Sequence, residues 1–166
     1  MMKKIALFGN PNTGKTSLFN QLTGLNQQVG NYPGVTVERK VGNCTLTNGQ
    51  KAKIIDLPGT YSLNTTSKDE NVVLELLLNE NDNDFPDVIV VVSEVVNLSR
   101  NLLLFTQIKD LGIPTCLVVN MIDQMPAKGI QLNVPLLEEF LGTKVILTNS
   151  RTGEGLHELK EKLSTS

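Results

Sequence analysis

The 166-residue sequence has few cysteines, a single histidine and no surplus of positive charge. Cys44 and Cys116 lie in separate apolar segments without the spacing of metal ligands, which predicts buried, reduced thiols in a cytosolic setting. Lys and Arg number 15 against 17 Asp and Glu, which leaves a formal charge of −2. A nucleic-acid partner is therefore not expected, because no basic excess is available to neutralise phosphates.

Long hydrophobic runs are also lacking. The runs at Val88–Val92 and Thr115–Val119 are far shorter than the ~18 residues that indicate a membrane span. The composition, 40% hydrophobic and 19% charged, is typical of a folded globular chain and not of a disordered one. At the usual size of roughly 100–200 residues per domain, the length predicts one domain, which we expect to be soluble.

The sequence instead alternates short apolar runs with segments of helical period, which predicts βα units around a mostly parallel sheet. Six strands are expected, at Lys3–Phe8, Glu38–Leu46, Lys51–Asp56, Val88–Val92, Thr115–Asn120 and Lys144–Leu147. Five helices are expected, beginning at Lys15, at a Ser67–Glu70 capping box, at Leu98, at Val134 and near Leu156. Asn48-Gly49 favours a tight hairpin between the second and third strands, so the α/β sheet should contain one antiparallel pair.

The first strand is followed by Gly9-Asn10-Pro11-Asn12-Thr13-Gly14-Lys15-Thr16 and then by a helix. This context predicts a P-loop, in which the glycines let backbone N–H groups surround a diphosphate at a helix N-terminus. Lys15 would bridge the β- and γ-phosphates, and the Thr16 hydroxyl would bind Mg²⁺. The predicted phosphate contacts in this segment are Asn10, Asn12, Thr13, Gly14, Lys15, Thr16 and Ser17. The alternative is a glycine-rich turn with a solvated lysine.

Asn120-Met121-Ile122-Asp123 closes the fifth predicted strand, at the end where a doubly wound sheet binds its ligands. A carboxylate there can accept hydrogen bonds from N1–H and the 2-amino group of guanine, which adenine cannot supply, so Asp123 is predicted to select GTP. The loop after the last strand would offer N–H groups to the guanine O6. The predicted guanine-binding residues are Asn120, Met121, Asp123, Asn149, Ser150 and Arg151. The alternative for Asp123 is an Asx-type turn.

Asp56-Leu57-Pro58-Gly59 ends the third predicted strand. Asp56 would hold Mg²⁺ through a water, and the Gly59 N–H would contact the γ-phosphate. Thr36 would complete the Mg²⁺ shell only while the γ-phosphate is present, with Gly34 beside the same phosphate. Thr60 stands where Ras-like enzymes carry a water-orienting glutamine, so another group must position the attacking water. Together these elements predict a P-loop GTPase of the Ras-like fold.

The elements are similar to the five motifs of the translation-factor-related GTPases. Gly30–Glu38, Gly9–Asn12 and Asn97–Leu102 resemble the N-terminal G domain of the bacterial ferrous iron transport protein B family (FeoB). The resemblance implies a regulatory GTPase at the cytoplasmic face of the inner membrane, followed by a helical and a polytopic membrane domain that we expect to be absent from this chain. It leaves self-association open. Departures from the family are Tyr32 for Trp, Glu94 for Asp, and Asn149-Ser150 for Ser-Ala.

The resemblance also implies activation by K⁺, with Asn12 as a ligand and backbone carbonyls near Gly30 and Tyr32 completing the site. The implied activity is slow intrinsic hydrolysis of GTP to GDP and phosphate, with Asn12, Lys15, Thr36 and Gly59 as the catalytic group. An alternative for Asn12 is a side chain that braces its own turn. Alternative functions are a stand-alone or ribosome-assembly GTPase switch, and a nucleotide-binding module with negligible turnover.

Overall fold

The computed structural model describes residues 2–24, 27–33, 37–60 and 68–166, which form a seven-stranded sheet and six helices. The strands are β1 (Lys3–Gly9), β2 (Gln27–Asn31), β3 (Glu38–Thr45), β4 (Lys51–Asp56), β5 (Val88–Glu94), β6 (Thr115–Asn120) and β7 (Val145–Leu147). The helices are α1 (Lys15–Thr23), α2 (Lys68–Leu78), α3 (Leu98–Lys109), α4 (Gln124–Lys128), α5 (Val134–Leu141) and α6 (Leu156–Ser164).

The sheet has the order β2-β3-β4-β1-β5-β6-β7. β4, β1, β5, β6 and β7 are parallel, whereas β3 is antiparallel to both β2 and β4. The predicted hairpin between β3 and β4 is confirmed: Gly49 has φ 82°, and the Leu46 N–H donates to the Gln50 carbonyl at 2.9 Å. Because parallel strands end at the same edge of a sheet, the loops after β1, β4, β5, β6 and β7 share one edge.

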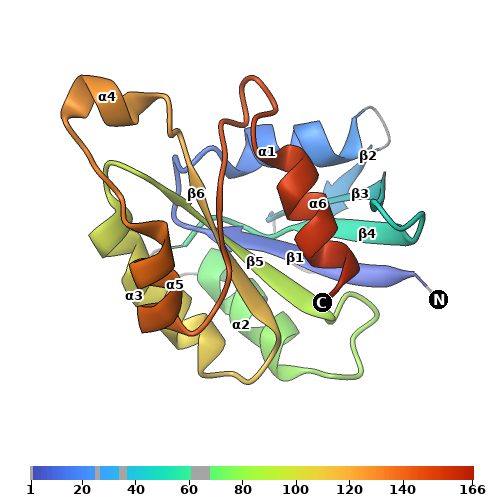
Figure 1. Ribbon diagram of the computed structural model, residues 1–166. Helices are drawn as coiled ribbons and strands as arrows, with labels where there is room; N and C mark the ends of the chain where they lie inside the picture. Colours follow the sequence, from blue (N-terminus) through green and yellow to red (C-terminus); the bar gives the residue numbers. More distant parts are fainter. Residues whose placement is uncertain (1, 25–26, 34–36, 61–67) are drawn as a thin grey trace.

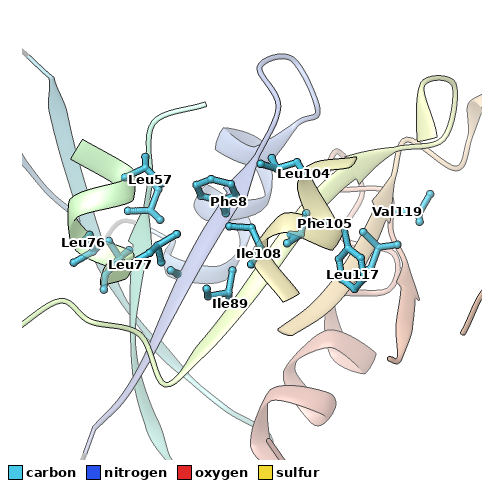
Figure 2. Packing of buried hydrophobic residues seen from close by; sticks show 14 of the residues in the cluster. Phe8, Leu57, Leu76, Leu77, Ile89, Leu104, Phe105, Ile108, Leu117 and Val119 are labelled. Carbon is cyan, nitrogen blue, oxygen red and sulfur yellow. The ribbon is translucent and has the colours of Figure 1, made fainter. Parts of the chain in front are cut away.

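Helices cover both faces of the sheet (Figure 1), and each face has its own buried hydrophobic cluster. On one face, Leu18, Phe19 and Leu22 of α1 pack with Leu159 and Leu163 of α6. On the other face, α2, α3 and α5 cover the strands; Figure 2 shows Leu76, Leu77, Leu104, Phe105 and Ile108 from the first two of these helices packed against strand residues. The central strands are buried on both faces, which explains their continuous apolar runs.

Two elements were not predicted, β2 and α4. In β2 the first residue is half-buried and the other four are exposed, so the strand is held by its pairing with β3 and leaves no apolar alternation in the sequence. α4 is five residues long and buries none of them, so it also lacks a hydrophobic pattern. The remaining elements lie within two residues of the predicted bounds. Ser67 of the predicted capping box lies outside the described residues.

The structure also describes the cap of α5, the two cysteines and the lengths of the helices. Asn133 caps α5 by accepting a hydrogen bond from the Leu136 N–H at 3.1 Å, as its position before the helix predicts. Cys44 and Cys116 are both buried and free. Within the described ranges, no helix has both the length and the apolar composition needed to cross a bilayer.

Candidate nucleotide-binding site

The P-loop turn joins the end of β1 to the start of α1 and borders a cavity of about 380 Å³. The cavity is lined by Asn10, Pro11, Asn12, Gly14, Lys15, Thr16, Ser17 and Gly59. The two glycine positions of the motif leave no room for a side chain. A Cβ atom on Gly9 would collide with the Val92 carbonyl, and one on Gly14 with the Asn120 amide. The close approach of neighbouring strands and loops therefore explains both glycines.

The middle of this turn adopts an unusual backbone conformation. Asn12 has φ 68° and is one of two described non-glycine residues with positive φ; the other is Met121. Asparagine tolerates this left-handed region better than most residues. The turn is braced by the Thr13 hydroxyl, which donates to the Asn10 carbonyl at 3.1 Å. The side chain of Asn12 is exposed at the cavity and is available for a ligand.

Lys15 and Asp56 bring the start of α1 to the end of β4. The Lys15 ammonium forms an ion pair with Asp56 Oδ1 and donates to the Leu57 carbonyl at 2.6 Å. Both side chains are largely buried, at 10% and 6% exposure. The group predicted to bind the γ-phosphate, Lys15, and the group predicted to bind the metal, Asp56, are thus in direct contact. Both line a second cavity of about 240 Å³, which β3 also borders.

The chemistry of these donors fits Mg²⁺. A hydroxyl on Thr16 and a carboxylate on Asp56 are hard oxygen ligands, and protein sites for Mg²⁺ usually supply only one or two ligands beside the substrate phosphates. Among the described residues no group of three or more His, Cys, Asp and Glu could hold a metal ion by itself. A metal site here therefore depends on phosphate oxygens.

The segment after β4 contacts the P-loop. The Thr60 N–H donates to the Gly9 carbonyl at 2.9 Å, and a Cβ on Gly59 would lie 3.2 Å from Pro11 Cγ. Gly59 thereby lines the P-loop cavity. The contact of its N–H with a γ-phosphate stays a prediction.

Asn120 connects three loops of the site. Its Nδ2 donates to the Thr13 carbonyl and to Ser150 Oγ, each at 3.0 Å. Its Oδ1 accepts from Thr148 Oγ1 and from the Ser150 N–H, each also at 3.0 Å. The amide is 1% exposed and makes all four bonds that its two donors and two lone pairs allow. The P-loop, the end of β6 and the loop after β7 are therefore held together by one side chain.

Other residues predicted to bind guanine lie in the same two loops. Met121 follows β6 with φ 62°, and Asp123, which is exposed, precedes α4 directly. In the loop after β7, Asn149 Oδ1 accepts from the Arg151 N–H at 3.1 Å, and the Asn149 N–H donates to the Glu154 carbonyl at 3.0 Å. Asn149 thus stabilises its own loop.

The ferrous iron transport protein B family matches residues 3–163. The chain belongs to this family. The Fe(2+) transporter FeoB of Leptospira biflexa is 48% identical over 162 residues, which cover 98% of this chain and 23% of the transporter. FeoB of Escherichia coli strain K12 is 45% identical over 165 residues, or 96% of this chain and 21% of the transporter. The chain thus spans about a fifth of the length of these relatives.

Solved FeoB structures share the fold. The G domain of the T. maritima FeoB iron transporter is 44% identical with a TM-score of 0.89, covering 99% of this chain and 98% of that one. A mutant of S. thermophilus NFeoB bound to GDP is 43% identical with a TM-score of 0.88, covering 97% of this chain and 61% of that one. The predicted fold class and the resemblance to FeoB G domains are therefore confirmed.

Glu94 is one of the departures from the FeoB pattern, and the structure explains how it is accommodated. Its carboxylate accepts hydrogen bonds from the backbone N–H groups of Val96 at 3.0 Å and Asn97 at 2.8 Å. The Glu94 N–H donates to Asn101 Oδ1 at 2.9 Å. Glu94 and Asn101 together fix the turn between β5 and α3, a role that sequence reasoning did not assign to either residue.

A second unpredicted cluster lies near Tyr32, another of the three departures. Asp84 is 5% exposed and accepts hydrogen bonds from Lys53 Nζ at 2.7 Å and from Arg39 Nε at 2.8 Å. Burial opposes the ionisation of Asp84, but these two cations outweigh it and hold the pKa of the carboxyl below its usual value. Burial, reinforced by the negative charge of Asp84, raises the pKa of Tyr32 to about 12. The Tyr32 hydroxyl is buried without a hydrogen-bond partner among the described residues.

The residues predicted for K⁺ and for the sensing of the γ-phosphate are only partly described. Gly34 and Thr36 lie outside the described residues. Gly30 belongs to β2, and Tyr32 borders a cavity of about 470 Å³ against α2. Neither Gly30 nor Tyr32 is among the described residues that line the P-loop cavity. The K⁺ site therefore stays a prediction.

Proposed function

We propose that the chain binds GTP, hydrolyses it to GDP and phosphate, and alternates between the two nucleotide states as the regulatory domain of a ferrous iron transporter. The observation that carries this proposal is the saturated Asn120 amide, which joins the P-loop to the two base-recognition loops. A phosphate site and a base site held in one hydrogen-bond network suit a nucleoside phosphate. Membership of the FeoB family supports the transport context.

We assign the residues of the site the following roles. In hydrolysis, a water oxygen bonds to the γ-phosphorus while the bond to the β-phosphate oxygen breaks, and the water proton leaves with the phosphate. Lys15 is placed to exchange its bond with Asp56 for the β- and γ-phosphates. Thr16, Thr36 and, through a water, Asp56 would hold Mg²⁺, which neutralises phosphate charge when bound. The Gly59 N–H would contact the γ-phosphate, with Gly34 beside it.

Potassium activation is the finer part of the proposal. The cavity-facing, exposed side chain of Asn12 and the absence of any arginine in Gly9–Thr16 support it. Asn12 would be a K⁺ ligand together with carbonyls of Gly30 and Tyr32, and the ion would supply positive charge between the β- and γ-phosphates. Intrinsic turnover is expected to be slow, since Thr60 replaces a water-orienting glutamine.

The proposal extends to the setting of the chain. Because it spans only about a fifth of its FeoB relatives, we infer a longer parent protein with helical and membrane domains. The domain would lie at the cytoplasmic face of the inner membrane, with guanine nucleotide as its ligand. Self-association is tested by measuring the molar mass of the chain in its GDP and GTP states.

Base selection is tested by exchanging the recognition carboxylate. The chain should bind GTP and GDP in calorimetry and show no comparable affinity for ATP. Asp123→Asn should lose guanine affinity and gain affinity for xanthine nucleotides, whose 2-oxo group accepts from the new amide. Asp110→Asn, an exposed aspartate on the loop after α3, is the matched control. Retained GTP preference in Asp123→Asn would overturn the base assignment.

Potassium dependence has its own experiment. GTP turnover should rise markedly in KCl over NaCl at equal ionic strength, and Asn12→Ala should remove that rise. Asn43→Ala, an exposed asparagine on β3, should keep it. Equal wild-type rates in the two salts would refute K⁺ activation without affecting the GTP-binding proposal.

A second function is favoured by one observation, the combination of Thr60 with an arginine-free P-loop. A module of this kind could signal by nucleotide occupancy with negligible turnover. Single-turnover hydrolysis in K⁺ separates the two functions, because a switch that hydrolyses GTP converts the bound nucleotide and an occupancy module releases it unchanged.

A further inference from the structure

The end of the hairpin formed by β2 and β3 extends past the neighbouring strand. The pairing of β3 with β4 begins at Lys40, whereas the two residues before it, Glu38 and Arg39, pair with β2 alone. We call residues 30–32 and 37–39 the hairpin tip. A two-stranded hairpin is only marginally stable by itself, so the tip depends on contacts with its surroundings.

Apolar packing of the hairpin tip against α2 is incomplete. The two sides of the tip are joined by the Tyr32 N–H, which donates to the Val37 carbonyl at 2.9 Å. Tyr32 faces Val72 and Glu75 of α2 across the cavity of about 470 Å³ that these residues line. Because close packing is absent from this cavity, a polar contact carries more of the attachment of the tip.

The polar contact of the tip is the ion pair between Arg39 and Asp84. Arg39 donates from both Nε, at 2.8 Å, and Nη2 to Asp84 Oδ2. Among the described residues, no other side-chain hydrogen bond or ion pair joins the tip to an element outside the hairpin. Asp84 itself is fixed independently of Arg39: its N–H donates to Asp82 Oδ1 at 2.8 Å, and its Oδ1 accepts from Lys53 Nζ at 2.7 Å. Asp84 is therefore a firm anchor for the tip.

The position at which this anchor holds the tip is not the one that the proposed K⁺ site requires. The proposed ligands from the tip are the carbonyls of Gly30 and Tyr32, yet neither residue lines the P-loop cavity that Asn12 lines. For these carbonyls to join Asn12 at one ion, the tip would have to leave the place where Arg39 is paired with Asp84.

We propose that Asp84 is a positioning residue that acts through Arg39: the ion pair holds the hairpin tip away from the P-loop and thereby sets how much K⁺ the GTPase requires. This inference rests on the proposed K⁺ activation. A restraint that favours the unproductive position lowers the fraction of chains that can bind K⁺ productively, and the apparent affinity for K⁺ falls with that fraction. Asp84 is charged at neutral pH, because its two cations hold the pKa of the carboxyl below its usual value.

The test compares Arg39→Met with Lys53→Met. Each variant removes one cation from Asp84, but only Arg39 belongs to the hairpin tip, since Lys53 lies on β4. GTP turnover is measured against KCl, with NaCl keeping the ionic strength constant. In Arg39→Met the half-activating KCl concentration should fall about three- to tenfold, while turnover at saturating KCl stays within about twofold. Lys53→Met should keep the wild-type KCl requirement, and Arg39→Lys should restore part of it.

Two further measurements separate this role from a structural one. Tm should fall in both Arg39→Met and Lys53→Met, because each variant leaves the buried Asp84 carboxylate with one cation instead of two. Amide hydrogen exchange of residues 28–32 in the GDP-bound chain should become faster in Arg39→Met and stay unchanged in Lys53→Met, since only the first variant releases the tip.

Each other outcome overturns the inference. An unchanged or higher KCl requirement in Arg39→Met would show that the ion pair does not oppose the K⁺ site. An equal fall in Lys53→Met would attribute the effect to lost stability and not to the position of the tip. A wild-type turnover that does not depend on K⁺ would refute K⁺ activation itself, so the failure of the inference and the failure of the proposed function are distinguishable.

Discussion

The proposed base end and the proposed γ-phosphate end of the site are built differently. At the base end, the Asn120 amide has every hydrogen bond it can make, and Asn149 closes its own loop. At the γ-phosphate end, the Asn10 carboxamide has no partner among the described residues, and Lys15 is paired with Asp56. The proposed base end is complete within the protein, whereas at the proposed γ-phosphate end a nucleotide would have to replace Asp56 as the partner of Lys15.

This difference fits a protein that must hold its nucleotide in two states. Guanine and the β-phosphate are common to GTP and GDP, so the groups that bind them can be fixed in advance. The γ-phosphate is present in only one state, so a group that binds it needs another partner in the other state. For Lys15 that other partner is Asp56. Two substitutions test this contrast, and two more test the polar groups near Tyr32, in order of decreasing expected effect.

Lys15→Ala should have the largest effect on the γ-phosphate end. We expect GTP affinity to fall about 100- to 1,000-fold, or roughly 3–4 kcal/mol, because a charge-assisted contact to phosphate is lost and Asp56 stays buried without its cation. GDP affinity should fall less. Calorimetry with both nucleotides measures the split, and Lys51→Ala, an exposed lysine on β4, is the control. Equal losses for GTP and GDP would remove the distinction between the two ends.

Asn120→Ala should damage the base end and its link to the P-loop. The variant loses four hydrogen bonds and leaves the Ser150 and Thr148 groups unpaired, so the free energy of unfolding should fall by about 3 kcal/mol. Urea denaturation measures this loss, with Asn43→Ala as the exposed control. GTP and GDP affinities should decrease to the same extent. A loss confined to GTP would contradict the assignment of Asn120 to the constant end.

Asp84→Asn tests the ion cluster near Tyr32. At pH 7 the free energy of unfolding should fall by about 2 kcal/mol, since Arg39 and Lys53 lose the charge they share. The folded-state pKa of Asp84 lies below its unfolded value of 3.8, so the stabilisation is present above about pH 4. It is lost as pH falls through the folded pKa. Unfolding curves from pH 7 to pH 3 should show this loss in the wild type and not in Asp84→Asn.

Tyr32→Phe should have the smallest effect. The hydroxyl is buried without a partner among the described residues, so its removal should change the free energy of unfolding by less than about 0.5 kcal/mol, in the stabilising direction. Thermal denaturation measures the change. A clear destabilisation would show that the hydroxyl is hydrogen-bonded in solution.

The sequence predicted the fold well wherever burial leaves a pattern. β5 and β6 are buried on both faces and read as continuous apolar runs, and the Asn48-Gly49 turn identified the hairpin between β3 and β4. β2 was missed because hydrogen bonding to β3 depends on the backbone, which every residue supplies alike. α4 was missed because it buries no side chain.

Residue type and spacing singled out Lys15, Asp56 and Asn120; the structure pairs the first two and bonds the third to the P-loop, while their roles stay predictions. The supporting contacts had no such signal. Asp84 lies in an ordinary polar loop, and nothing local marks its meeting with Arg39 and Lys53 from two strands. The hydrogen bond from the Glu94 N–H to Asn101 likewise depends on how α3 packs beside β5. Contacts between distant segments emerge only once the sheet order is known.

Met121 follows β6 in the left-handed region, at φ 62°, and this limits which sequences can occupy the base loop. A β-branched side chain would be disfavoured there by about 1–2 kcal/mol, whereas Gly, Asn or Asp would relieve the strain. Gly would also enlarge the conformational freedom of the unfolded chain, at a cost of about 0.4–1 kcal/mol that offsets part of the gain. In related sequences we therefore expect unbranched or small residues at this position, and not Val, Ile or Thr.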